Sequence, residues 1–491
     1  MLNLFARKGT PCFQTSTAMF RTAPMKRLVI MRTKQLLLSS ATLLPMLGMA
    51  QTDRPNIVII VADDLGWGDV SHHGSVIPTP NIDRILNEGI ELDRFYTAPV
   101  SSPTRCGLMT GRYPNRFGIR ETVIPPWRDY GLPVEEETMA DVLGRNGYAH
   151  RAAIGKWHMG HSKQRYYPLN RGFTHFHGAL NGAIDYFEHT REKELDWHDD
   201  WESCYEKGYS TDLIAAESAR CIKEYAKEGP YFIYTCFNAP HSPYQAPEEE
   251  IRKFISKEEF DSLPPKDQKG WTYRAMVSRM DKGIGAILQA ISESGEWDNT
   301  LILFFSDNGG VPGMEPYSVN RPLRGSKFDE WEGGVRTVAG IYWKKAFRQG
   351  HRKLDQVTGF VDILPTLADI VEIKETPKNP YDGISISSVL KGEKEQIDRD
   401  FYLGCGAGVC AQYKLILANQ HMRLQKDFIT DIQKNPSEKR EGRIYEDPER
   451  VSQLRRTIQE GDAIVPYQEE IPFGKGQKGF VAPKEWKITE Y

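Results

Sequence analysis

The chain of 491 residues lacks several features that would assign it to a particular class of protein. Its formal net charge is −3, so no basic surplus is present to hold nucleic acid or an anionic membrane surface. Cysteine is scarce, with seven residues, although Cys405 and Cys410 are close enough in sequence to form a disulfide. We therefore expect no nucleic-acid partner, and an anionic ligand would need a local group of cations.

Long apolar runs are also missing, apart from one short run near the N-terminus. Arg32 and Lys34 precede an apolar stretch over residues 36–49 that ends in small residues, which is typical of a secretory signal peptide starting at Met31. This stretch is too short and too interrupted for a stable membrane span. We expect residues 1–50 to be an extension plus signal peptide, and the protein to be exported, to a bacterial periplasm or the medium.

The remaining sequence alternates short apolar runs with helical patterns, which predicts an α/β sandwich with a large mixed sheet. The expected buried strands are 56–62, 149–154, 231–235 and 301–305, with helices over 211–225 and 273–294. The composition becomes more charged after about residue 395, with a plausible strand at 413–416 and a helix at 448–460. We therefore divide the chain into a catalytic domain (51–395) and a smaller α+β subdomain (396–491).

The most informative segment is residues 101–112, which read SSPTRCGLMTGR. A serine followed by a proline two positions later suits the start of a helix, where the missing N–H of proline has no cost. Ser101 would then lie at the positive end of the helix dipole, with Arg105 one turn further on the same face. The simplest interpretation of this local pattern is a serine-capped helix.

The twelve-residue pattern resembles the formylglycine motif of type I sulfatases. In that family the first residue of the motif, here Ser101, is oxidised to an aldehyde whose hydrate attacks sulfur. Further segments resemble family motifs in the family's order: VADDLG at 61–66, GKWHMG at 155–160, NAPHSP at 238–243, FSDNGG at 305–310 and PLRGSK at 322–327. The resemblance implies an alkaline-phosphatase-like α/β sandwich and the hydrolysis of sulfate esters.

Within the family, the segments from Arg171 to Tyr186 are most similar to arylsulfatase B, the N-acetylgalactosamine-4-sulfatase. This chain departs from that enzyme by having serine instead of cysteine at position 101, so it would need a maturase that acts on serine. The serine, together with the absence of an Asn-x-Ser/Thr sequon, favours a bacterial exported protein.

The resemblance also assigns the site residues. It implies one divalent ion, first of all Ca²⁺, because the donors are oxygens without cysteine or histidine. The expected ligands are Asp63, Asp64, Asp307, Asn308 and the modified residue 101. The expected catalytic and sulfate-binding residues are Ser101, Arg105, Lys156, His158, His241 and Lys327.

In the implied reaction, His241 protonates the leaving sugar oxygen with Lys327 nearby, and His158 is the base of the second step. Asp185 is the candidate contact to a sugar hydroxyl, with turn capping as its structural alternative. We expect an exo-acting sulfatase on sulfated carbohydrates, with 4-O-sulfated N-acetylgalactosamine as the first candidate. Sugars sulfated at the 6-O, 3-O or 2-O position remain alternatives.

Two other functions remain open. One is a phosphatase or phosphodiesterase of the same superfamily, although two-zinc enzymes of that kind need histidine ligands, and Asn308 stands where one would be expected. The other is a non-catalytic binder of sulfated glycans, if Ser101 is never oxidised.

Overall fold

The computed structural model describes residues 54–347, 352–439 and 447–491. The expected signal peptide over residues 1–50 lies outside these ranges. The four expected strands form close to the predicted places, because their apolar residues become buried in the sheet; only β4 begins with two half-buried polar residues, His150 and Arg151. They are β1 (Asn56–Ala62), β4 (His150–Lys156), β10 (Tyr231–Cys236) and β11 (Thr300–Ser306).

These strands form the centre of a ten-stranded sheet with the order β14-β2-β13-β11-β1-β10-β4-β5-β8-β9. The neighbours of β1 run parallel to it, while β13 pairs antiparallel with β11 and with β2, so the sheet is mixed as expected. The remaining strands are β2 (Ile90–Leu92), β5 (His175–Ala179), β8 (His198–Asp199), β9 (Glu202–Ser203), β13 (Ala339–Tyr342) and β14 (Arg352–Leu354).

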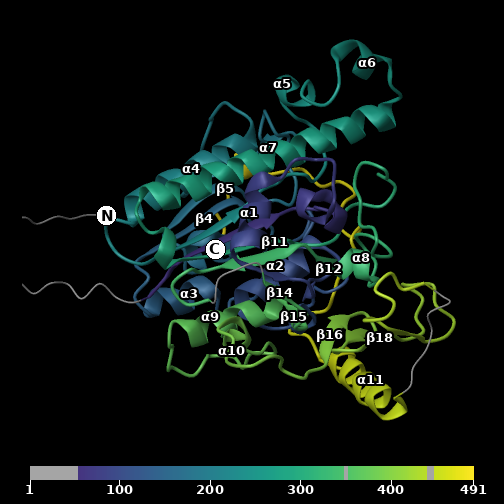
Figure 1. The fold of residues 1–491 in the computed structure, drawn as a ribbon. Helices are drawn as coiled ribbons and strands as arrows, with labels where there is room; N and C mark the ends of the chain where they lie inside the picture. The colour runs from purple at the N-terminus through teal and green to yellow at the C-terminus, as the bar shows by residue number, and fades with distance from the viewer. Residues whose placement is uncertain (1–53, 348–351, 440–446) are drawn as a thin grey trace, which may run out of the picture. The chain divides into compact units, whose positions relative to one another are not determined.

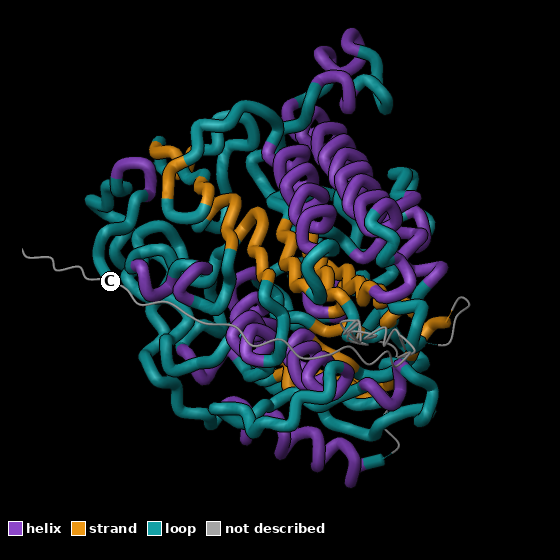
Figure 2. Tube along the Cα trace, turned by 90° about the vertical axis from the view of Figure 1, so that its left-hand side faces the viewer, coloured by secondary structure: helices purple, strands orange, loops and turns teal. Residues whose placement is uncertain are grey.

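Alternate side chains of β1 point into two separate hydrophobic cores, one on each face of the sheet. Val58 and Ile60 pack with the helices on one face, and Ile57 and Ile59 with those on the other. Figure 1 shows α4 and α7 across the first face, and Figure 2 shows helices on both sides of the strands. The first face carries α1 (Pro80–Glu88), α4 (Ser210–Tyr225) and α7 (Pro265–Glu293), and the second α2 (Ser101–Thr110), α3 (Met139–Arg145) and α9 (Ile363–Ile370).

A smaller antiparallel sheet follows, with the order β16-β17-β18-β19. One of its faces joins the core of the large sheet, and the other packs against α11 (Pro448–Asp462). Figure 1 shows α11 beside β16 and β18. The strands are β16 (Phe401–Gly404), β17 (Ala407–Val409), β18 (Tyr413–Ile416) and β19 (Phe428–Asp431).

The C-terminal segment (residues 464–491) leaves this small sheet and returns to the large unit. The amide of Tyr467 donates to the carbonyl of Arg116 at 2.8 Å, and Trp486 is fully buried. The expected small α+β unit is therefore present, but the last residues of the chain pack elsewhere. The domain limits at 51–395 and 396–491 stay a prediction.

Two details differ from expectation. Helix α7 begins at Pro265, earlier than the expected residue 273, because proline is tolerated in the first turn of a helix. The six cysteines among the described residues are free thiols. Cys405 contacts the guanidinium of Arg120, whereas Cys410 packs under α11, so these two thiols face different surroundings.

Shorter elements connect these units: β3 (Phe95–Tyr96), β6 (Thr190–Arg191), β7 (Glu194–Leu195), β12 (Arg336–Thr337), β15 (Thr358–Gly359), α5 (Glu248–Ile251), α6 (Lys257–Ser262), α8 (Glu332–Val335) and α10 (Ser387–Leu390). Strands β12, β3 and β15 form a three-stranded sheet, and β6 pairs with β7.

In the described part of the chain, no helix is both long and apolar enough to cross a bilayer.

Candidate active site

The candidate site forms where parallel strands of the large sheet end side by side. The loops after β1, β10 and β11 are joined by backbone hydrogen bonds: Asp63 N donates to Ala239 O at 3.1 Å, and Asp307 N donates to Ala62 O at 3.0 Å. Asp64 adopts a left-handed backbone with φ of 65°. This turn sends the two neighbouring aspartates into the same buried space.

Ser101 is the first residue of α2, so the predicted helix start is confirmed, but the cap position is held by Val100 and the serine does not cap the helix. The serine side chain instead enters this space. Its Oγ lies 3.2 Å from Asp63 Oδ1 and 3.4 Å from Asn308 Oδ1. Asn308 also donates to Asp64 Oδ1 at 2.7 Å, and the backbone N–H of Asp64 donates to Asp307 Oδ1 at 3.3 Å. The structure thus brings together all five predicted metal ligands.

Three cations neutralise the three buried carboxylates of this group. Arg105 Nη2 lies 2.8 Å from Asp307 Oδ2, Lys156 Nζ lies 2.5 Å from Asp63 Oδ2, and Lys327 Nζ lies 2.7 Å from Asp64 Oδ1. Lys156 also donates to Ser101 Oγ at 3.3 Å. Since opposite charges in a dry site attract strongly, these pairs keep the ionised groups in place.

The protonation of these groups follows from burial and from their neighbours. Burial raises the pKa of Asp63 despite the attraction of Lys156. Burial also acts on Asp64, but Lys327 and His241 outweigh it and lower the pKa of that carboxyl. Burial lowers the pKa of Lys156, whereas for Lys327 the nearby aspartates outweigh burial and raise the pKa.

The donor set fits a hard divalent cation. The carboxylates and the amide oxygen of Asn308 are all buried and converge beside Ser101. Oxygen donors of this kind suit Ca²⁺ or Mg²⁺. His241 is a nearby nitrogen, since its Nε2 lies 3.6 Å from Asp64 Oδ2. Asp63, Asp64 and His241 therefore also form a possible set of ligands.

The two predicted acid–base histidines flank the serine. Burial and the charges of Lys156 and Arg105 lower the pKa of His158 far below its usual value, so its imidazole is neutral at neutral pH. Burial also lowers the pKa of His241. The Nδ1 of His241 lies 2.5 Å from the carbonyl oxygen of Ser242, which can only accept, so this nitrogen carries a proton.

A cavity of about 740 Å³ opens above this group, a size that suits a small-molecule ligand. Its inner end is lined by Ser101, His158, His241 and Lys327. The outer wall includes Glu121, Pro125, Pro126, Arg191, Phe328, His421, Glu470, Ile471, Pro472 and Phe473. No sequence motif pointed to these outer residues, because they come from loops and from the C-terminal segment.

Asp185 makes its side-chain hydrogen bonds to its own turn and to Gln245, and not to the group around Ser101. Its Oδ1 accepts the backbone N–H groups of Phe187 and Glu188 at 2.9 and 2.8 Å, and its Oδ2 accepts Gln245 Nε2 at 2.6 Å. It is not among the residues that line the cavity. This geometry favours the turn-capping alternative over the sugar contact.

Residues 55–373 match the model of the Sulfatase family, and these residues include every motif discussed above. The match covers more than half of the chain, and it agrees with the mixed sheet and with the group of side chains at its strand ends. The chain therefore belongs to the sulfatase family. This membership supports its assignment as a sulfuric ester hydrolase.

Individual relatives agree with this assignment. The chain is 32% identical to Arylsulfatase J of Mus musculus, over 70% of this chain and 56% of that protein. It is 29% identical to N-acetylgalactosamine-6-sulfatase of Rattus norvegicus, over 78% of this chain and 75% of that protein. The crystal structure of Ps i-CgsB with k-i-k-neocarrahexaose superposes with a TM-score of 0.74 at 29% identity, covering 87% and 96% of the two chains. The particular similarity to arylsulfatase B stays a prediction.

Proposed function

We propose that this protein is an exo-acting sulfatase that removes sulfate from carbohydrates, using a formylglycine made from Ser101 and one calcium ion. The main support is the position of Ser101 at the inner end of the cavity, within hydrogen-bond distance of both Asp63 and Lys156. We further propose that the protein is exported to a bacterial periplasm or to the medium, on the basis of its N-terminal sequence.

The nucleophile would need a modification that serine alone does not provide. The hydrated aldehyde would supply one hydroxyl to attack sulfur and a second to release the sulfate afterwards. An unmodified serine has a single hydroxyl, so it would be sulfated once and not regenerated. Arg105 supports this arrangement by holding Asp307, one of the proposed metal ligands, with two nitrogens at 3.0 and 2.8 Å.

The cations explain how an anionic ester would be accepted. A calcium ion would add positive charge beside the sulfate and stabilise charge that develops during transfer. Asp63, Asp64, Asp307, Asn308 and residue 101 would hold it. Lys156 and Lys327 contact Asp63 and Asp64, so both ammonium groups lie beside the proposed metal ligands, where they would attract an anionic ester.

His158 and His241 would carry out the proton transfers. Neutral His158 can accept a proton in the second step, because its environment disfavours the charged form. His241 can donate to the leaving oxygen only from Nε2, since Nδ1 faces the Ser242 carbonyl, and so it must first gain a second proton. Lys327, which stays protonated, is the alternative donor.

For the substrate, we propose galacto-configured sugars, with 4-O-sulfated N-acetylgalactosamine as the first candidate from the sequence and 6-O-, 3-O- or 2-O-sulfated sugars as alternatives. The name of the rat relative, an N-acetylgalactosamine-6-sulfatase, makes the 6-O position the first of these to compare. The bound oligosaccharide in the Ps i-CgsB structure further supports a carbohydrate substrate.

A desulfation screen tests this proposal. Purified protein, checked by intact mass of the peptide containing residue 101, is incubated with mono- and disaccharides sulfated at single positions, and released sulfate is measured. We expect activity only in preparations with the oxidised residue. Active protein with an unmodified serine would refute the mechanism, and oxidised protein that binds but never hydrolyses sulfated sugars would favour the glycan-binder alternative.

The metal is tested separately. Chelation should abolish activity, and calcium should restore it, because the proposed ligands are oxygens. Stoichiometric zinc at this site, with activity restored by zinc and not by calcium, would instead point to His241 as a ligand. Hydrolysis of phosphate esters in preference to sulfate esters would then favour the phosphatase alternative.

A further inference from the structure

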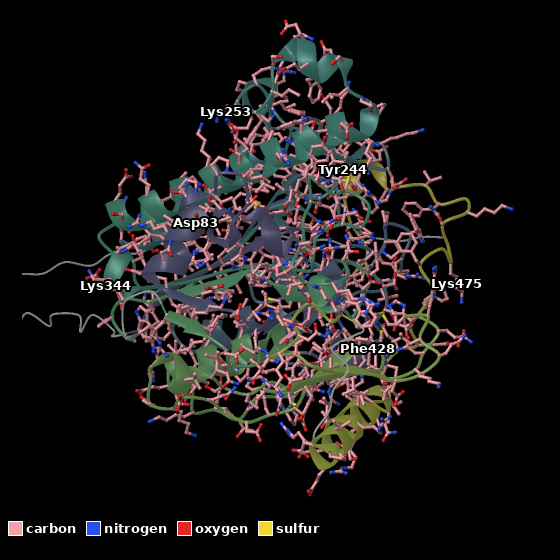
Figure 3. The ribbon with its side chains drawn as sticks, turned by 45° about the vertical axis from the view of Figure 1, so that its right-hand side comes forward. Asp83, Tyr244, Lys253, Lys344, Phe428 and Lys475 are labelled. Carbon is pink, nitrogen blue, oxygen red and sulfur yellow. The ribbon has the colours of Figure 1, made fainter. Side chains whose placement is uncertain are left out.

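A second group of potential metal ligands lies outside the site described above. His72 and His73 end a short 3₁₀ helix (Ser71–His73), and Glu91 lies on β2. The Nε2 atoms of His72 and His73 lie 3.3 and 3.0 Å from the two carboxylate oxygens of Glu91. One ligand atom from each of the three residues lies within 4.8 Å of the others. Asp83, labelled in Figure 3, accepts the backbone N–H of His72 and marks this part of the molecule.

The orientation of His73 is fixed by its other nitrogen. Its Nδ1 lies 2.7 Å from the carbonyl oxygen of Trp67, and its ring stacks on the Trp67 indole with centroids 3.7 Å apart. A carbonyl oxygen only accepts, so Nδ1 carries the proton. In the neutral imidazole, Nε2 then directs a lone pair at a carboxylate oxygen of Glu91, which is repulsive. A cation, either a proton or a metal ion, must therefore lie between them.

The distances fit a metal ion of the size of zinc as well as they fit hydrogen bonds. Zinc binds histidine nitrogen and carboxylate oxygen at about 2.0–2.2 Å, which places tetrahedral ligands about 3.3 Å apart. The observed separations of 3.0 and 3.3 Å are close to this value. A histidine that donates one N–H to a backbone carbonyl while its other nitrogen faces the metal is also the usual arrangement of such ligands.

Lys353 is the cation that would compete with a metal ion for Glu91, and it binds Glu91 only weakly. Lys353 Nζ lies 3.6 Å from Glu91 Oε1 but only 2.9 Å from Asp93 Oδ1, and its side chain is 49% exposed. It can remain with Asp93 when another cation binds Glu91. Glu91 itself is almost fully buried, so it depends on partners for its charge.

A second His–Glu group, around His175, is stabilised by protonation of the histidine and serves as a comparison. Both nitrogens of His175 face carboxylates, Asp200 at 2.9 Å and Glu217 at 2.7 Å. Burial would lower the pKa of His175, but its hydrogen bonds to Cys221 and Glu217 raise it to about 10, so the imidazole is protonated. Glu217 is also paired with Arg220 at 2.5 Å. His73 differs from His175, because its Nδ1 faces the backbone carbonyl of Trp67 and not a carboxylate.

We propose that His72, His73 and Glu91 form a zinc site with three protein ligands and a fourth position open to water. The site is separate from the oxygen ligands around Ser101. It would join the loop that follows Asp63 and Asp64 to β2, so its role would be to stabilise that loop rather than to take part in hydrolysis.

The test uses the full mature chain, freed of metal by chelation and dialysis, and titrated with Co²⁺ and then Zn²⁺. We expect visible ligand-field bands on adding one equivalent of Co²⁺, their loss on adding Zn²⁺, and a rise in Tm of at least about 2 °C with zinc. The double variant Asp63→Asn/Asp64→Asn should keep these signals, which separates the result from the proposed calcium site and from the proposed function.

Variants at the site give the decisive comparison. His72→Ala and Glu91→Gln should each weaken zinc binding by more than the about 10- to 100-fold that loss of a supporting partner costs. His150→Ala, which removes another histidine paired with a glutamate, is the matched control and should bind zinc normally. Unchanged zinc affinity in both site variants, or no binding of either metal by the unaltered protein, would overturn the proposal and leave an imidazolium–carboxylate pair.

Discussion

The inner end and the outer wall of the cavity are built in different ways. Inner residues come from the ends of buried strands and the start of α2, and ion pairs hold almost every side chain. The outer wall combines the loop over residues 121–126, the hairpin at Arg191, the neighbourhood of His421 and residues 470–473. We therefore expect the chemistry and the choice of substrate to depend on separate parts of the chain and to respond separately to mutation.

The largest effect is expected at the inner end. Ser101→Ala should abolish turnover of every sulfate ester, because it removes the atom that would carry the nucleophile. The fold should remain, since a substitution at a helix start costs about 1 kcal/mol or less. Released sulfate and Tm are the measurements, and Cys106→Ala, in the same helix, is the control that should retain activity. Turnover by the Ser101→Ala variant would disprove the assignment of the nucleophile.

Lys327→Gln should reduce kcat/KM by about 10²–10³-fold, the usual effect of removing a group that stabilises developing charge. The loss should be equal for a small aryl sulfate and for a sulfated sugar, because Lys327 lies at the shared inner end. Lys475→Gln, on the C-terminal segment labelled in Figure 3, is the matched control and should change neither substrate by more than about twofold. A loss confined to the sugar would place Lys327 among the specificity residues.

Glu470 offers a test of the outer wall. Its Oε1 accepts the backbone N–H groups of Arg120, Glu121 and Thr122 at 3.1, 2.6 and 3.2 Å, and so fixes the C-terminal segment beside the cavity. Glu470→Ala should lower kcat/KM for a sulfated oligosaccharide by about tenfold, from loss of about 1–3 kcal/mol of interactions. Activity on a small aryl sulfate should change little.

Glu470→Gln is the control for that experiment, since its amide oxygen can still accept the three N–H groups. It should retain most of the oligosaccharide activity. Equal losses on both substrates in Glu470→Ala would show that the two ends of the cavity are not independent, and the comparison above would fail.

The smallest effect is expected at Asp185. Because its carboxylate caps a turn and binds Gln245, Asp185→Ala should lower the free energy of unfolding by about 1–2 kcal/mol and affect all substrates alike. Denaturant unfolding and kcat/KM for both kinds of substrate check this. A selective loss on the sulfated sugar at unchanged stability would restore the sugar contact that the sequence suggested.

The sequence predicted the centre of the fold because its strands are continuous apolar runs followed directly by polar residues. Asp63 and Asp307 directly follow β1 and β11, Lys156 is the last residue of β4, and His241 lies in the loop after β10. Parallel strands bring such positions to one edge of the sheet. The outer wall could not be predicted in this way. Glu470 reaches the cavity only because the C-terminal segment returns past Arg116, and no local pattern encodes that return. For Asp185 the sequence left turn capping and sugar binding open, because both use the same residue type.

The burial of Ser101 also sets an order of events. The residue is 1% exposed, and every residue of α2 is buried beneath the large sheet and its loops. An enzyme that oxidises this serine has to bring its own active site to the Ser101 side chain, which lies buried at the inner end of the cavity in the finished structure, where a second protein cannot reach it. In the proposed scheme, the modification therefore has to happen while the chain is still unfolded, and a molecule that folds before meeting the maturase is permanently inactive.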